Sequence, residues 1–265
     1  MDSEEVDVSK FIFMGSELFG LGPLLKWDFN VRPGTMDDWI VAETIINDIY
    51  RVREIPSVLG YTPQTIVDLG GHIGGFSALA MKAFAGVSLY TYEAHLQNYI
   101  VLQSNLITDE GKVRYGRDYA NPPSITLNNN IVCGDEPPTS FLTDSTPKET
   151  TAGLRMNTGG GKVVYGEEKT SITTPHTTLE QIIDDNRLDK IDFLKMDIEG
   201  SEFQVLEHAK KTGALEKVKY LACELHVNPK RGRNFDTFMG YLDNFSEIEV
   251  VHDKKKNHRM VFAKQ

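Results

Sequence analysis

Short apolar runs and longer amphipathic segments alternate along most of the chain. Runs of strand length occur at residues 65–69, 87–92, 124–132, 191–196 and 218–225. Apolar residues recur at helical spacing in the segments 36–52, 76–84, 95–107, 178–186 and 203–211. This alternation is typical of a parallel sheet with helices on both faces. Near the end, two short strands at 248–251 and 260–263, joined by a polar turn, predict an antiparallel hairpin.

The predicted fold is therefore α/β, with a mostly parallel sheet of seven strands and a C-terminal antiparallel hairpin. A chain of 265 residues suits one α/β domain with a small addition. Turn-rich residues 57–63 separate an N-terminal extension, 1–60, from a core domain, 61–265. We expect the extension to be helical and to pack on the core. Residues 136–174, rich in Thr, Gly and Pro, predict a long insertion with at most a short hairpin.

Composition argues against several classes of protein. The formal net charge of −10 disfavours a nucleic-acid partner, because such binding depends on neutralising phosphates. No apolar run reaches the roughly 20 residues that a membrane helix needs, so we expect no membrane partner. The acidic start lacks a signal-peptide pattern, and the cysteines, Cys133 and Cys223, are far apart in the sequence. We therefore expect a cytoplasmic protein with small buried cysteines and no metal site.

The first core strand ends in a glycine-rich turn, Val67-Asp68-Leu69-Gly70-Gly71-His72-Ile73-Gly74. Glycines allow positive φ and let a ligand approach main-chain amides, and the start of the next helix adds unpaired donors. The second core strand ends at Glu93, about 25 residues beyond Asp68, where a carboxylate can accept hydrogen bonds from ribose hydroxyls. These features predict a site for a cofactor that contains adenosine. The alternative is an ordinary loop, since glycine turns after strands are common.

The spacing of the glycines bears on which cofactor binds. A dinucleotide-binding G-x-G-x-x-G pattern counted from Gly70 meets His72 where its second glycine should stand. The pattern D-x-G-x-x-x-G fits instead through Asp68, Gly70 and Gly74, which favours a cofactor without a pyrophosphate. A terminal hairpin is also unusual for nicotinamide-binding domains. Both S-adenosylmethionine and a nicotinamide dinucleotide contain adenosine, so the distance to Glu93 does not separate them, but the turn and the hairpin favour the first.

A second group of ionisable residues follows the fourth and fifth core strands. Asp197 and Glu199 leave the carboxyl end of one strand, and Glu224 and His226 that of the other. Residues two apart on an extended segment face the same side, so both pairs can face one cleft above the glycine turn. A carboxylate or an imidazole placed there would serve as a general base. The alternatives are that Glu199 and Glu202 cap the next helix and that His226 is a structural histidine.

Several blocks of residues occur in an order that is typical of one family. They are Val31-Arg32-Pro33-Gly34-Thr35-Met36-Asp37, Val67 to Gly74, Tyr92-Glu93, Asn105, Thr178-Leu179-Glu180 and Lys195-Met196-Asp197-Ile198-Glu199-Gly200-Ser201-Glu202. These blocks, within residues 31–227, resemble the FkbM family of S-adenosylmethionine-dependent methyltransferases. The resemblance implies a Rossmann-like class I methyltransferase fold, which habitually ends in an antiparallel hairpin. It also implies methyl transfer to a hydroxyl oxygen of a small molecule or sugar.

The resemblance, with the reasoning above, assigns roles to individual residues. The cofactor would be held by Asp68, Gly70, Gly71, His72, Gly74, Glu93, Ala94 and Asp197. Catalysis would involve Asp197, Glu199 and His226. Two positions depart from the family pattern: Gly71-His72 replaces Ala-Asn, which puts an imidazole beside the cofactor, and Ala94 replaces Pro. The segments 107–123 and 136–174 exceed the family's usual lengths, so the methyl acceptor is not inherited from the resemblance.

Two other classes of function stay open at this point. A nicotinamide-dependent oxidoreductase would share an adenosine-binding turn, and a catalytically silent module would keep the fold without the reaction. The incomplete G-x-G-x-x-G pattern and the terminal hairpin disfavour the first class. The joint presence of Asp68, Glu93, Asp197 and Glu199 disfavours the second.

Overall fold

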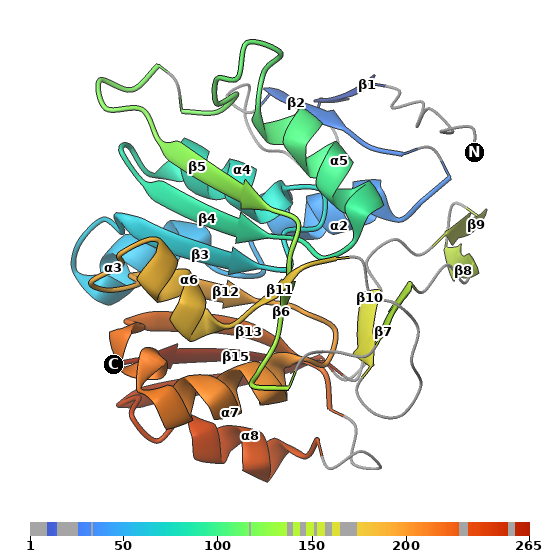
Figure 1. Ribbon diagram of the computed structural model, residues 1–265. Coiled ribbons are helices and arrows are strands. Elements are labelled where there is room, and N and C mark those ends of the chain that lie inside the picture. Colours follow the sequence, from blue (N-terminus) through green and yellow to red (C-terminus); the bar gives the residue numbers. More distant parts are fainter. Residues whose placement is uncertain are drawn as a thin grey trace.

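A seven-stranded sheet lies at the centre of the protein (Figure 1). The computed structural model describes residues 10–14, 26–32, 34–116, 118–136, 140–143, 147–150, 153–156, 161–164, 174–227, 233–253 and 258–265. The strand order is β14-β15-β13-β12-β3-β4-β5. The strands are β3 (Thr65–Leu69), β4 (Ser88–Tyr92), β5 (Ser124–Asn128), β12 (Phe193–Met196), β13 (Tyr220–Leu225), β14 (Glu247–Asp253) and β15 (His258–Lys264). Neighbouring strands are parallel except where β15 pairs with β13 and β14. The predicted mixed sheet with a terminal antiparallel hairpin is confirmed.

Helices cover both faces of this sheet, because its strands bury side chains on both sides. In β12, Phe193 belongs to a core with α4 (Gly75–Ala83) and α5 (Leu96–Leu106). Its neighbour Leu194 belongs to a second core, which includes residues of α6 (Leu179–Asp185), α7 (Glu202–Thr212) and α8 (Phe235–Tyr241). Strands buried on both faces are expected where helices lie above and below a parallel sheet. The short helix α8 has no counterpart among the predicted elements.

The N-terminal segment packs on the first of these cores. It contains β1 (Lys10–Met14), β2 (Lys26–Asn30), α2 (Asp37–Val41), the π-helix η1 (Ala42–Ile46), the 3₁₀-helix η2 (Val52–Glu54) and α3 (Ile55–Leu59). The prediction of one helix over 36–52 is wrong in its second half, because Asp48 and Arg51 have φ of 49° and 57°. The extension also holds the antiparallel pair β1–β2, which the helical prediction did not include. The boundary near residue 60 stays a prediction.

The predicted strand 124–132 is divided in the structure. Residues 124–128 form β5, whereas β6 (Ile131–Val132) leaves the sheet and pairs with β11 (His176–Thr177). Between β6 and β11, the insertion contains β7 (Ser140–Thr143), β8 (Pro147–Thr150), β9 (Gly153–Met156) and β10 (Gly161–Val164). They pair as β7–β10 and β8–β9, so the expectation of at most one short hairpin is wrong. Figure 1 draws these strands on the side toward which the parallel strands point.

Two shorter features complete the part of the chain that the structure describes. The 3₁₀-helix η3 (Ala214–Lys217) connects α7 to the strand β13. No helix among the described residues is long and apolar enough to cross a membrane.

Candidate cofactor and catalytic site

The glycine turn after β3 is wedged between two neighbouring strands. Gly70 has φ of 85°, and a Cβ on it would lie 1.8 Å from the carbonyl oxygen of Asp197. A Cβ on Gly71 would lie 2.4 Å from Cγ2 of Thr91. The amides of Gly70 and Gly71 donate to the carbonyl of Tyr92 at 2.9 and 3.0 Å. The turn therefore requires glycine at both positions, for conformation at the first and for space at both.

Asp68 lies beneath the turn and is fully buried. Its Oδ2 accepts a hydrogen bond from Ser77 Oγ at 2.8 Å, and its Oδ1 lies 3.3 Å from Nζ of Lys195. The same ammonium donates to the carbonyl of Gly70 at 2.6 Å. Burial alone would lower the pKa of Lys195, but the carboxylates of Asp68 and Asp197 outweigh it and raise the pKa. Asp68 and Lys195 thus form a charged pair that fixes the shape of the turn from below.

Glu93 contacts the turn from the end of β4. Its Oε2 accepts from the amide of His72 at 2.8 Å, and its Oε1 accepts from the amide of His95 at 2.8 Å. Burial raises the pKa of Glu93 to about 7, although these two hydrogen bonds act in the opposite direction. The carbonyl of the next residue, Ala94, accepts from Nδ2 of Asn129 at 3.1 Å. The structure thus brings Glu93 and His72 together, as a shared cofactor site requires.

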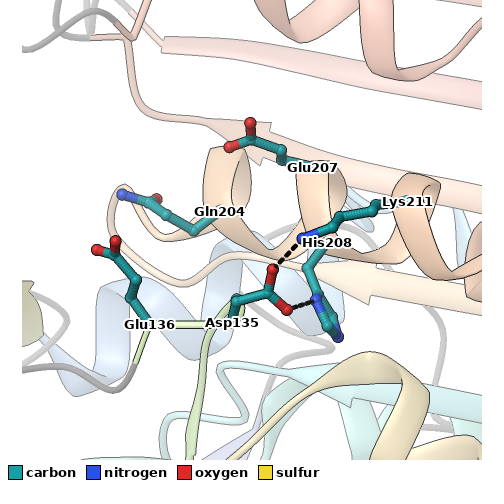
Figure 2. A pocket seen from close by; sticks show the side chains of 7 residues that line it. Asp135, Glu136, Gln204, Glu207, His208 and Lys211 are labelled. Atoms are coloured by element: carbon teal, nitrogen blue, oxygen red, sulfur yellow. Dashed lines mark hydrogen bonds and ion pairs between the residues drawn. The ribbon is translucent and has the colours of Figure 1, made fainter.

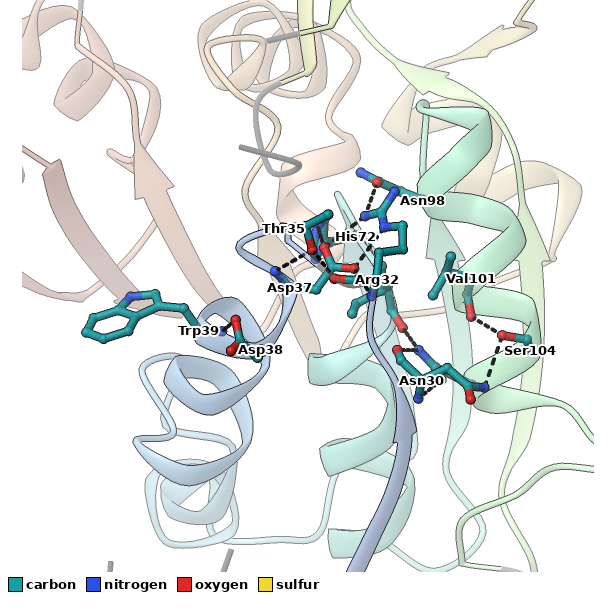
Figure 3. Close-up of polar contacts among 12 residues, drawn as sticks. Asn30, Arg32, Thr35, Asp37, Asp38, Trp39, His72, Asn98, Val101 and Ser104 are labelled. Atoms are coloured by element: carbon teal, nitrogen blue, oxygen red, sulfur yellow. Dashed lines mark hydrogen bonds and ion pairs between the residues drawn. The ribbon is translucent and has the colours of Figure 1, made fainter. Parts of the chain in front are cut away.

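The imidazole of His72 points toward the N-terminal segment, where Arg32 and Asp37 form a buried ion pair (Figure 3). Arg32 donates from Nε and Nη2 to the two oxygens of Asp37 at 2.8 and 2.9 Å, and from Nη2 to Asn98 Oδ1 at 2.8 Å. Nε2 of His72 lies 3.6 Å from Oδ1 of Asp37. Burial lowers the pKa of His72 to about 4, so the ring is neutral at neutral pH.

A second buried contact ties the N-terminal segment to the turn. The side chain of Asn105, on α5, accepts from the amide of Asn30 at 2.7 Å and donates to its carbonyl at 3.0 Å. The same amide group donates to the carbonyl of Ile73 at 2.9 Å. Asn105 is fully buried, so each of these bonds is costly to lose. Asn105, noted only for its part in the family resemblance, therefore links the main chain at Asn30 to the glycine turn at Ile73.

At the end of β12, Asp197 is half-buried beside the turn. Its Oδ2 accepts a hydrogen bond from the hydroxyl of Tyr50 at 2.8 Å. Burial would raise the pKa of Asp197, but Lys195, His226 and the Tyr50 hydrogen bond together lower it below its usual value. Asp197 is therefore a carboxylate at neutral pH. Tyr50 lies in the segment 36–52, for which an amphipathic helix was predicted, and it was not among the predicted site residues.

Glu199, Glu202 and His226 form one cluster. Nδ1 of His226 lies 2.9 Å from Oε1 of Glu202, and its Nε2 lies 3.4 Å from Oε2 of Glu199. Burial would lower the pKa of His226, but Glu202 and Glu199 raise it well above its ordinary value, so the ring is protonated. Burial, together with the nearby carboxylates, raises the pKa of Glu199 to about 7. Glu199 also has a φ of 54°, a backbone conformation that is uncommon outside glycine.

Glu202, for which helix capping was the alternative, contacts the turn and His226. It is the first residue of α7 and is fully buried. Its Oε1 accepts from the amides of Ile198 and Gly200 at 3.2 and 3.1 Å, in addition to its contact with His226. These amides belong to the turn before α7, and no side chain among the described residues caps the start of that helix by a hydrogen bond. Glu202 therefore holds the turn and the histidine and does not cap the helix.

The structure places the predicted site residues along one edge of the sheet. Within the described residues, no group of three or more His, Cys, Asp or Glu side chains is arranged to hold a metal ion. A separate pocket of about 340 Å³ lies against α7, and none of the predicted site residues lines it. Figure 2 shows this pocket with Asp135 bonded to His208 and to Nζ of Lys211, the latter at 2.7 Å.

The chain thus combines a mixed seven-stranded sheet that ends in a hairpin with a glycine turn set against acidic strand ends. Residues 68–254 match the family model described as the methyltransferase FkbM domain, which is well over half of the chain. The chain belongs to this family. A comparison with curated protein sequences found no match.

Solved structures with a similar arrangement include methyltransferases, at low sequence identity. An O-methyltransferase from Bacillus cereus in complex with SAH is 10% identical, with a TM-score of 0.42, and the match covers 83% of this chain and 81% of that one. EvdMO1 is 14% identical with a TM-score of 0.42, and monomeric WbdD is 11% identical with a TM-score of 0.42. The match covers 82% and 84% of this chain but spans only 40% and 41% of those two proteins.

Proposed function

We propose that the protein is an S-adenosylmethionine-dependent O-methyltransferase that acts on a hydroxyl group of a small molecule or sugar. Membership of the FkbM methyltransferase family supports the reaction class. The observation that carries the proposal is the contact between Gly70 and Asp197, which puts the acidic end of β12 directly beside the glycine turn. The free, buried cysteines Cys133 and Cys223 fit the cytoplasmic setting that we also propose.

The residues at this edge fit the proposed cofactor. A carboxylate offers about four lone-pair positions. On Glu93 the amides of His72 and His95 account for two, and Nδ2 of Asn98, at 3.5 Å from Oε1, for a third. The remaining position is suited to a ribose hydroxyl. S-adenosylmethionine carries a positive sulfonium, and Asp197, with its lowered pKa, supplies a negative charge beside Gly70. Gly70, Gly71 and Gly74 would let the cofactor approach the main chain.

When bound, S-adenosylmethionine supplies an activated methyl group on a positively charged sulfur. The chain's own contribution is charge, position and a proton acceptor. Glu199 has a pKa of about 7, close to the value that favours a general base at neutral pH. Its side chain is 35% exposed, so an acceptor hydroxyl can approach it. In this proposal Glu199 accepts the proton from the acceptor hydroxyl, and Asp197 stays ionised near the sulfonium.

His226 is not suited to the role of general base that a histidine with an ordinary pKa would take. Both of its ring nitrogens face carboxylates, and its pKa is raised well above the ordinary value by Glu202 and Glu199 despite burial. A protonated imidazole cannot accept a proton. We therefore propose that His226 orients Glu199 and that Glu202 in turn holds His226, so that the base is positioned by a second group and that group by a third.

Two experiments test the proposal. Calorimetry with S-adenosylmethionine, S-adenosylhomocysteine, NAD and NADP should show binding of the first two alone; binding of NAD or NADP instead would favour an oxidoreductase. A screen of hydroxylated metabolites and sugars for release of S-adenosylhomocysteine should then identify the acceptor. Cofactor binding without release for any hydroxylated compound would favour a silent cofactor-binding module and contradict the O-methyltransferase.

A further inference from the structure

Tyr50 brings the N-terminal segment into the site, ahead of the residues 68–254 that match the family model. Its hydroxyl donates to Oδ2 of Asp197 at 2.8 Å, and its side chain is only 4% exposed. The ring packs edge-on against Phe76, with centroids 5.7 Å apart, and Nζ of Lys195 lies 5.1 Å from its centroid. The tyrosine is thus held on several sides by buried groups, and its hydroxyl meets a carboxylate at the edge of the sheet.

The backbone around this tyrosine is irregular. The π-helix at 42–46 ends shortly before it, and Asp48 and Arg51, on either side of it, have φ of 49° and 57°. Residues in this conformation cost energy, and such strain is concentrated at functional sites. The strain is held by local bonds: the Asp48 carboxylate accepts from the amides of Val52 and Arg53 at 2.7 and 3.0 Å. This irregular turn takes the place of the regular helix that was predicted over 36–52.

The hydrogen bond has a direct electrostatic effect on Asp197. A donor to the ionised form favours that form, and the Tyr50 bond acts with the charges of Lys195 and His226 against burial to lower the pKa of Asp197. Burial and Asp197 together raise the pKa of Tyr50 well above its ordinary value, so the hydroxyl remains a donor at neutral pH. The same bond fixes the rotation of the carboxylate, because it binds one of its two oxygens.

We propose that Tyr50 is a positioning residue for the cofactor site: it holds the Asp197 carboxylate toward the sulfonium of bound S-adenosylmethionine. The inference rests on the proposed function and extends the site beyond the family-matched residues. The N-terminal segment is then part of the site, since it supplies this hydroxyl.

A matched pair of variants tests this role. Tyr50→Phe removes the hydroxyl and keeps the ring. Tyr61→Phe is the control, because the Tyr61 hydroxyl donates to Oδ1 of Asp192 at 2.9 Å, and Asp192 precedes the same strand, β12, at its other end. Both variants are made in the wild-type chain and in Asp197→Asn. Calorimetry measures the affinity of each protein for S-adenosylmethionine and for S-adenosylhomocysteine, which lacks the sulfonium charge, and thermal unfolding checks the fold.

Tyr50→Phe should weaken S-adenosylmethionine binding by about 10-fold, the scale of a lost hydrogen bond to a charged group, and S-adenosylhomocysteine binding by less. In the Asp197→Asn background it should have little further effect, and Tyr61→Phe should leave both affinities unchanged. If the wild type binds the cofactor, two results would overturn the role of Tyr50. One is an equal loss of affinity on Tyr50→Phe in the wild-type and Asp197→Asn backgrounds, and the other is no loss of affinity in either. Failure of the wild type to bind either compound would overturn the proposed function as well.

Discussion

The main chains of Gly70 and Asp197 are in contact across two parallel strands. A Cβ on Gly70 would lie 1.8 Å from the Asp197 carbonyl oxygen, and the Asp197 amide donates to the carbonyl of Leu69 at 3.0 Å. The pairing of β3 with β12 thus continues to the point where both strands turn away from the sheet. The glycine turn and the acidic end of β12 therefore cannot move independently.

Gly70→Ala should destabilise the fold and abolish cofactor binding. The added Cβ meets a backbone atom, which cannot rotate away, and φ of 85° adds strain of about 1–2 kcal/mol for a residue other than glycine. Gly60→Ala is the matched control, since Gly60 has φ of 78° with nothing within 4 Å of its Cβ position. Urea unfolding and calorimetry with S-adenosylhomocysteine should show a much larger effect at Gly70. Equal effects at the two glycines would mean that the contact with Asp197 is not restrictive.

Glu93→Gln should weaken S-adenosylhomocysteine binding by about 1.5–3 kcal/mol, the value of hydrogen bonds to a charged group. The amide side chain keeps one acceptor oxygen but places an NH₂ group against the main-chain donor of His72 or His95. Because the pKa of Glu93 is raised to about 7, wild-type affinity should rise as pH increases through 7. The variant should lack this rise. Unchanged affinity would remove Glu93 from the ribose-binding role, provided that thermal unfolding shows an intact fold.

Much of the core was predictable because its elements have strong local patterns. The apolar run at 65–69 followed by glycines gives β3 and its turn, and the predicted strands at 191–196 and 218–225 contain β12 and β13. The break after residue 46 was not predictable in the same way. Its apolar spacing continues that of a helix, while the positive φ at Asp48 and Arg51 depends on contacts formed only in the folded protein.

The residue types at the candidate site were predictable from the sequence, but the directions in which their side chains point were less so. Acidic residues after β12 indicated chemistry at that edge, yet a glutamate at a helix start is also a common capping residue. Glu202 instead bonds the turn before the helix, and its contact with His226, which follows a different strand, shows where its carboxylate points. For Lys195, the sequence signal of a role in the site was its position as a lysine inside an apolar strand. The sequence carried no comparable signal for Tyr50, since an aromatic residue at helical spacing is typical of a core.

His72 should make stability depend on pH. The unfolded chain binds a proton at this residue with a pKa near 6.5, whereas burial lowers the pKa in the folded protein to about 4. Between these values protonation favours the unfolded state, so the free energy of unfolding should fall as pH falls from 6.5 to 4. The difference corresponds to roughly 3 kcal/mol. His72→Asn, whose side chain tolerates the positive φ of 48°, should show a shallower fall in chemical denaturation. Identical slopes would mean that folding does not lower the pKa of His72.

Glu199→Gln should act mainly on the rate, and Glu202→Gln mainly on stability. Glu199 is the proposed proton acceptor, so replacing it with an amide of similar volume should lower kcat by roughly 10²–10³-fold with little loss of stability. Wild-type kcat should rise with pH through about 7, where Glu199 loses its proton, and the variant should lack this limb. The assay is release of S-adenosylhomocysteine with the acceptor found by screening.

Glu202→Gln removes a buried charge that accepts two main-chain amides and holds His226. It should lower the free energy of unfolding by about 1–3 kcal/mol, because buried donors lose a strong acceptor. It should also lower the pKa of His226, whose rise is caused chiefly by Glu202. NMR titration of the His226 ring measures this change directly. If Glu202→Gln left stability and the His226 titration unchanged, and Glu199→Gln kept full turnover and its pH limb, neither carboxylate would have the role that the contacts indicate. The proton acceptor would then have to be sought at Asp197.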